Sequence, residues 1–138
     1  MASPSNPTDG QLEILQILWQ LELATVRQVN EILAQSRNVG YTTTLKLMQI
    51  MHEKGLLARE KQGKTHIYRP LITERETRRG MLNKLLDSAF GGSAAALVMQ
   101  ALGNHQTSQS ELDEIRKLLD QLEQDENPDN PSSNQSHS

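Results

Sequence analysis

Cysteine is absent from this chain of 138 residues, and aromatic residues make up only 3% of it. Without cysteine the chain has no disulfide bond, thiolate metal ligand or cysteine nucleophile, as is usual for cytosolic proteins. With so few aromatic residues, the core must be built mainly from aliphatic side chains. This composition favours helices.

Long hydrophobic runs are also absent. The amino-terminal segment MASPSNPTDG has no basic region followed by an apolar run, and no later stretch reaches the length of a membrane span. We therefore expect a soluble, cytoplasmic protein. The length suits one ordinary domain or two small ones.

The motifs of enzymes and metal sites are missing as well. Nothing resembles a nucleophile elbow or a phosphate-binding glycine loop, and no pair of carboxylates is evidently set in a cleft. The histidines are too scattered for metal-ligand spacing; they are His52, His66, His105 and His137. The sequence predicts neither an enzyme nor a bound metal or cofactor.

Charge is unevenly divided along the chain, although the formal net charge is -3. Through Gly80 there are eleven Lys and Arg against eight Asp and Glu, and from Met81 onward there are three against nine. Between Arg37 and Arg69 only Glu53 and Glu60 oppose the basic residues. A local positive surface matters more for phosphate contact than the charge of the whole chain, so binding to nucleic acid stays open.

Four helix starts are marked by a Ser or Thr with Glu or Gln three residues later, a pattern that can satisfy two unpaired backbone donors reciprocally. The pairs are Thr8 with Gln11, Thr25 with Gln28, Thr73 with Glu76, and Ser108 with Glu111. Apolar stripes follow each pair. The residues expected to face inward are Leu12, Leu15, Leu18 and Trp19 in the first helix, which ends near Leu21, and Val29, Ile32 and Leu33 in the second.

A further helix is predicted within GYTTTLKLMQIMHEKGLL, residues 40 to 57, and Gly55 should end it. Side chains three and four residues apart share a helix face. One face therefore holds Thr44, Leu47, Met48 and Met51, and the opposite face holds Thr42, Lys46, Gln49 and Glu53. The first face should be buried, and most groups on the second are of kinds that contact phosphates and base edges.

The next segment, LLAREKQGKTHIYRP, predicts a β-hairpin that turns at Gln62-Gly63 and ends at Pro70. Three helices followed by a hairpin indicate a mainly α fold, a winged helix-turn-helix, with the threonine-rich helix in the recognition position and the hairpin as the wing. Further helices are predicted: a long one that starts at Thr73, and after Gly91-Gly92 a short one with Ser93 as its expected cap and Gly103 at its end.

We expect four parts: a flexible amino terminus (1–7), a winged-helix DNA-binding domain (8–72), a helical dimerisation domain (73–124) and a disordered tail (125–138). The carboxy-terminal helices have few local partners, so we expect them to pair with a second copy of the chain. Packing wholly within one chain is the alternative. The residues expected at the dimer contact are Leu82, Leu85, Leu86, Phe90, Leu97, Val98, Leu112, Ile115, Leu118, Leu119 and Leu122.

The residues expected to contact double-stranded DNA lie on the recognition helix and the wing. They are Tyr41, Thr42, Thr43, Lys46, Gln49, Arg59, Lys61, Lys64 and His66. The ordinary alternatives are a solvated helix face and wing charges that protect an exposed strand edge. Arg27 and Arg37 are equally open to phosphate contact and to a purely structural role. A winged helix that binds proteins and not DNA is the alternative function, but it would not need cations on both elements.

The sequence resembles the penicillinase repressor (BlaI/MecI-type) family of bacterial winged-helix transcriptional regulators. The resemblance covers roughly residues 8–124. It is carried by LEILQILW (12–19), ATVRQVNEIL (24–33), YTTTLKLMQIMHEKGLL (41–57) and IYRPLI (67–72), and more loosely by LLDSAFGGSAAALV and SELDEIRKLLDQL.

This resemblance implies a homodimeric repressor whose amino-terminal domains bind a palindromic operator and whose carboxy-terminal helices interlock. It also implies a regulatory protease as a partner, with a cleavable bond near Gln100-Ala101. The Asn-Phe pair of the staphylococcal members is missing there, and the cysteine-rich metal motif of a copper-responsive branch is missing too. Operator, regulated genes and inducing signal are not implied.

Overall fold

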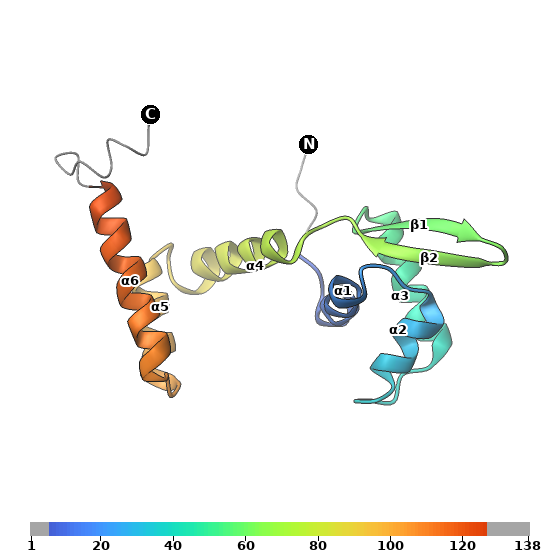
Figure 1. The fold of residues 1–138 in the computed structure, drawn as a ribbon, viewed down its shortest axis with the longest axis horizontal. Helices are drawn as coiled ribbons and strands as arrows, with labels where there is room; N and C mark the ends of the chain where they lie inside the picture. The colour runs from blue at the N-terminus through green and yellow to red at the C-terminus, as the bar shows by residue number, and fades with distance from the viewer. Residues whose placement is uncertain (1–5, 127–138) are drawn as a thin grey trace. The chain divides into compact units, whose positions relative to one another are not determined.

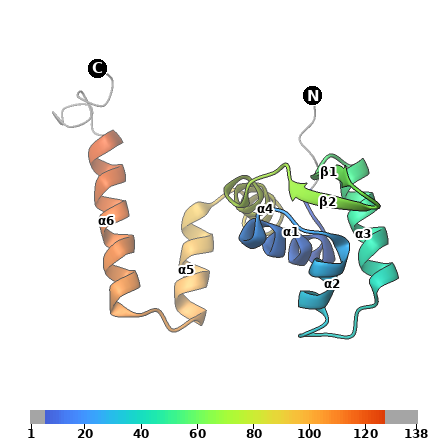
Figure 2. The ribbon, with the colours of Figure 1, turned by 45° about the vertical axis from the view of Figure 1, so that its right-hand side comes forward.

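The computed structural model describes residues 6–126, and within this range it contains six helices and one two-stranded antiparallel sheet (Figure 1). The chain divides between Gly92 and Ser93 into two compact units. The first unit holds α1 (Asp9–Leu21), α2 (Val26–Leu33), α3 (Tyr41–Glu53), β1 (Leu57–Gln62), β2 (Thr65–Pro70) and α4 (Glu74–Ala89). The second holds α5 (Ala94–Asn104) and α6 (Gln109–Glu126), two separate helices joined by a short connection (Figure 2).

The capping pairs confirm three of the predicted helix starts in full. At α1, α2 and α4 the threonine hydroxyl accepts from the backbone N–H three residues on, and the Gln or Glu side chain accepts from the threonine N–H. At α6, Ser108 Oγ accepts from the Glu111 N–H over 3.1 Å. These bonds are local, which is why they could be predicted from the sequence.

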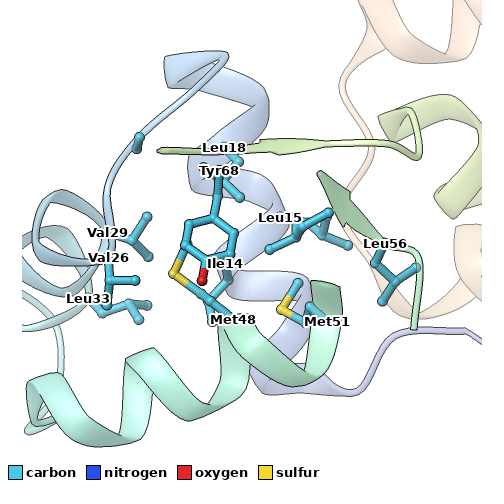
Figure 3. Packing of buried hydrophobic residues seen from close by; sticks show 12 residues of the cluster. Ile14, Leu15, Leu18, Val26, Val29, Leu33, Met48, Met51, Leu56 and Tyr68 are labelled. Carbon is cyan, nitrogen blue, oxygen red and sulfur yellow. The ribbon is translucent and has the colours of Figure 1, made fainter. Parts of the chain in front are cut away.

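One hydrophobic core joins α1, α2, α3 and the hairpin. Figure 3 shows the Tyr68 ring of β2 directed into it, among Ile14, Val29 and Met48. The buried apolar residues are Ile14, Leu15, Leu18, Ala24, Val26, Val29, Leu33, Met48, Met51, Leu56, Leu57 and Tyr68. Three helices and an antiparallel hairpin around one core form the predicted winged helix-turn-helix.

One predicted inward position, Ile32, was wrong, and another, Leu12, is only partly buried. The buried side of α1 runs through Gln11, Ile14 and Leu18, so Leu12 is only half-buried. The buried side of α2 consists of Val26, Val29 and Leu33, which leaves Ile32 36% exposed. Both helices carry more apolar residues than one face can hold, and only the packing partners decide which of them is turned inward.

The hairpin is shifted by one residue from its predicted turn. Gln62 is paired with Thr65, so the turn residues are Gly63 and Lys64 and not Gln62 and Gly63. Gly63 has a φ of 63°, a conformation that glycine adopts without strain, as at the first position of type II′ hairpin turns. Lys64 therefore lies in the tip itself.

An isolated β-bridge supports the base of the hairpin and was not predicted. Ala24 forms an antiparallel bridge with Tyr68, with N–H to O distances of 2.9 and 2.8 Å. A single bridged residue has no period that a sequence could reveal. This bridge holds β2 against the segment between α1 and α2.

Glu22, which ends α1 just before this bridge, has a φ of 72° and a ψ of -42°. A non-glycine residue pays about 1–3 kcal/mol for so rarely populated a conformation. Glu22→Gly should therefore raise the free energy of unfolding by about 1 kcal/mol, after allowance for the greater freedom of glycine in the unfolded chain. Chemical denaturation measures this, with Glu31→Gly inside α2 as a control that should destabilise. A Glu22→Gly protein less stable than its parent would contradict the strain.

The predicted boundary between residues 72 and 73 does not coincide with the division of the folded chain. Trp19 Nε1 donates to the Ile72 carbonyl over 2.9 Å, and Asn6 Nδ2 donates to the Gly80 carbonyl over 3.3 Å. Thr77 of α4 is only 2% exposed. Because these contacts tie the start of α4 to α1, the compact units separate after Gly92. The division into functional domains stays a prediction.

The predicted flexible and disordered ends fall largely outside the described residues, which exclude 1–5 and 127–138. Where the ends are described, they are more ordered than predicted. Asn6 makes the hydrogen bond to Gly80, and Asp125 and Glu126 belong to α6.

Membrane-span criteria give a simple result for residues 6–126. No single helix there is long and apolar enough to cross a bilayer, and only α4 and α5 taken together across their break reach the required length and composition.

Candidate nucleic-acid interface

Helix α3 divides as its sequence predicted. Thr44, Met48 and Met51 are fully buried and Leu47 is partly buried against the core, whereas the predicted DNA-contacting side chains of this helix are all exposed. The exposed set is Tyr41, Thr42, Thr43, Lys46 and Gln49. The helix therefore presents hydroxyl, ammonium and amide groups outward while its other side is held by the core.

The amino-terminal end of α3 has free hydrogen-bonding capacity. Gly40 precedes the helix and supplies no side-chain cap, and Thr44 is the residue whose N–H is bonded to the Gly40 carbonyl. The first N–H groups of a helix have no partner within it, and the helix dipole favours negative charge at that end. An anionic oxygen can accept from them.

Strand register places the wing cations. Arg59 is opposite Tyr68 and Lys61 is opposite His66, so these side chains share one face of the hairpin. On this face Tyr68 of β2 is buried in the core, whereas Arg59 opposite it on β1 and Lys61 nearer the tip are exposed. His66 and Tyr68 are also in edge-on contact, with ring centroids 6.4 Å apart.

A shallow concave surface of about 360 Å³ lies between the starts of α2 and α3 and the wing. Three of the predicted contact residues line it, namely Tyr41 from α3, Lys64 from the hairpin tip and His66 from β2. Its other lining residues are Thr25, Val26, Arg27, Leu45, Thr65 and Tyr68. The fold thus brings polar and cationic groups from three elements to one surface.

The remaining predicted residues do not line this concavity. Thr42, Thr43, Lys46 and Gln49 lie elsewhere on α3, and Arg59 and Lys61 lie along the wing. Arg27, which the sequence left open, does line it. Its position follows from the packing of α2 against the wing, for which the sequence has no local pattern.

Arg37, the other open case, forms a salt bridge with Glu13 at 3.0 Å. The two side chains are 45% and 39% exposed, so the pair contributes at most about 1 kcal/mol to stability. It joins the connection after α2 to α1. Of the two roles left open for Arg37, phosphate contact and a structural role, the structure shows the structural one.

Sequence reasoning missed Asn30. Its side-chain amide donates to the Val39 carbonyl and to Thr44 Oγ1, each over 2.9 Å. A polar residue inside a short helix is ordinarily read as solvated, so nothing in the sequence pointed to this link.

Within residues 6–126 no group of three His, Cys, Asp or Glu side chains is placed to hold a metal ion.

These features define the class of protein: a winged helix-turn-helix with polar and basic groups on its third helix and its wing. The family model described as penicillinase repressor matches residues 7–121, and the chain belongs to this family. The resemblance seen in the sequence is thereby confirmed.

Several characterised relatives are similar over most of their length. The chain is 23% identical to the penicillinase repressor of Bacillus licheniformis over 114 residues, which cover 83% of this chain and 89% of that protein. It is 29% identical to the transcriptional regulator BlaI of Mycobacterium tuberculosis over 121 residues, 86% of each chain. It is 22% identical to the methicillin resistance regulatory protein MecI of Mammaliicoccus sciuri over 112 residues, 81% of this chain and 91% of that one.

Among solved structures, the solution structure of the DNA-binding domain of the repressor BlaI is similar with a TM-score of 0.49 and 22% identity. The match covers 55% of this chain and 93% of that domain.

Proposed function

We propose that this chain is a homodimeric transcriptional repressor that binds a palindromic operator and blocks its promoter until an inducing signal releases it. Membership of the penicillinase repressor family supports a DNA-binding repressor. The operator, the dimer and the signal are the parts that we add.

The observation that carries the proposal is the concave surface shared by Tyr41, Lys64 and His66. Cations on a wing and polar groups on a helix are useful to DNA binding only when they face the same duplex. The recognition helix would enter the major groove, with Thr43 and Gln49 near base edges and its uncapped end near a phosphate. The wing cations would contact the phosphate backbone of the DNA beside this groove; they are Arg59, Lys61 and Lys64.

Dimer formation is supported by the second unit and by α4. No residue of α5 or α6 is buried in the single chain, although both helices carry many large apolar residues. Val98, Leu118 and Leu122 are 45–54% exposed. Such a concentration of exposed apolar surface marks an interaction site, and twofold pairing is the commonest arrangement.

Relief by proteolysis is one route that family membership supports. Gln100 and Ala101 are exposed but lie inside α5, so a protease would have to open the helix locally before cutting the bond between them.

Selection of bound fragments from the native genome, followed by footprinting, tests the proposal. We expect protection of a twofold site with half-sites about one or two helical turns apart. Thr43→Ala and Gln49→Ala should alter the preferred sequence, since base contacts and not phosphate contacts carry sequence information. No selected fragment, or an asymmetric single site, would favour the competing function of a winged helix that binds other proteins.

A further inference from the structure

We infer that Asn30 is a positioning residue that sets how the recognition helix α3 is presented to a DNA groove, an inference that rests on the proposed function. Asn30 lies on α2 and is itself half-buried. It has no place on the proposed DNA-contacting surface. Its effect would be exerted through α3.

The two hydrogen bonds of Asn30 straddle the start of α3. One N–H of its amide group meets the Val39 carbonyl, just before the N-cap residue Gly40, and the other meets Thr44 Oγ1 in the first turn. Thr44 is 0% exposed and cannot move without disturbing the core. A planar amide bound at both sites restrains where α3 begins and how it is rotated about its axis.

Such a restraint is needed because the connection between the two helices is long. Residues 34–40 separate α2 from α3, whereas the turn of a helix-turn-helix ordinarily has three or four residues. A long connection leaves more freedom to the helix that follows it. Successive residues are about 100° apart around a helix, so even a small rotation would carry Thr43 or Gln49 away from a base edge.

The need to give the buried Thr44 hydroxyl a hydrogen-bond partner does not by itself explain the bonds that Asn30 makes. Thr44 Oγ1 is also 3.4 Å from the Gly40 carbonyl, four residues earlier in the chain, and a threonine in a helix can bond to that carbonyl alone. The bond from Asn30 adds a link between two helices, and the bond to Val39 adds a second link that the hydroxyl does not require.

The experiment compares Asn30→Ala with Asn38→Ala, the same chemical change at an exposed position in the connection between α2 and α3. Binding is measured to the duplex recovered from genomic selection and to an unrelated duplex of equal length. Asn30→Ala should reduce the preference for the selected duplex about tenfold, the order of one lost base-pair discrimination. The salt dependence should not change, because the phosphate contacts are untouched. Asn38→Ala should leave both quantities at parental values.

Hydrogen exchange in the free protein provides a readout that needs no DNA. The amides of Thr44 and Leu45 should exchange about tenfold faster in Asn30→Ala, while that of Leu15 in α1 keeps its rate relative to global unfolding. Thr44→Val, which keeps the bond to Val39, should give an intermediate loss of preference and serves if Asn30→Ala does not fold.

The outcomes separate the two claims. Unchanged preference in folded Asn30→Ala, or in Thr44→Val where it is the variant used, would overturn the positioning role even if exchange is faster. Unchanged exchange at Thr44 would overturn the restraint itself. A parent protein with no preference for any duplex would refute the proposed function, and hydrogen exchange would still decide whether Asn30 holds α3.

Discussion

Replacing Lys61 and Lys64 together with alanine should weaken binding to DNA of every sequence by about 10- to 100-fold at physiological salt. Lys64 lines the concave surface, and Lys61 lies opposite His66 on the same wing face. Affinity falls as salt concentration rises. If both ammonium groups contact phosphates, each lost contact should also make the slope of log affinity against log salt concentration less negative by about 0.9. Titrations at several salt concentrations measure both effects.

The matched control is Lys84→Ala with Lys117→Ala, which removes the same charge from exposed positions of α4 and α6. Its affinity should fall far less and its salt slope should stay near the parental value, because only nearby charges form phosphate contacts. Equal losses in the two double variants would mean that total charge, and not the wing, determines binding. Unchanged affinity in the wing variant would remove the wing from the interface.

Ile115→Asp should convert the proposed dimer into monomers. Ile115 is half-buried on α6, next to Leu118 and Leu119, which are 54% and 53% exposed in the single chain. A carboxylate placed in a shared apolar contact has no partner, and a cost of about 3 kcal/mol or more would raise the dimer dissociation constant by at least about 100-fold. Sedimentation velocity measures the change directly.

Gln121→Asp adds the same charge at an exposed position of the same helix and should leave the dimer intact. Trp19, the single tryptophan, reports on the amino-terminal unit through its bond to Ile72, so its fluorescence should be equal in both variants. Operator affinity should fall in Ile115→Asp because two half-sites are no longer bound together. A sedimentation profile identical to that of the parent would contradict the apolar contact, and a monomeric parent would refute the dimer.

The two effects act on different properties. Loss of the wing cations should weaken binding to all DNA alike, whereas loss of the dimer should weaken binding to the twofold operator much more than to a single half-site. Comparing each variant on a full operator and on a half-site therefore distinguishes them. Together they test both units of the chain.

Several features followed from the sequence alone because their causes are local. The starts of α1, α2 and α4 depend on bonds between residues three apart, and the two faces of α3 depend on helical periodicity. The presence of the hairpin followed from residue types on both sides of a glycine. The family could be recognised because contiguous stretches such as LEILQILW (12–19) and IYRPLI (67–72) resemble those of its members.

The tertiary structure decided what depends on residues far apart in the chain. It turned Ile14 inward in place of Leu12 and paired Arg37 with Glu13. It brought Arg27 beside the wing and linked Asn30 to the start of α3. Each of these outcomes is set by which surfaces meet when the helices pack, and no local period or spacing records that choice.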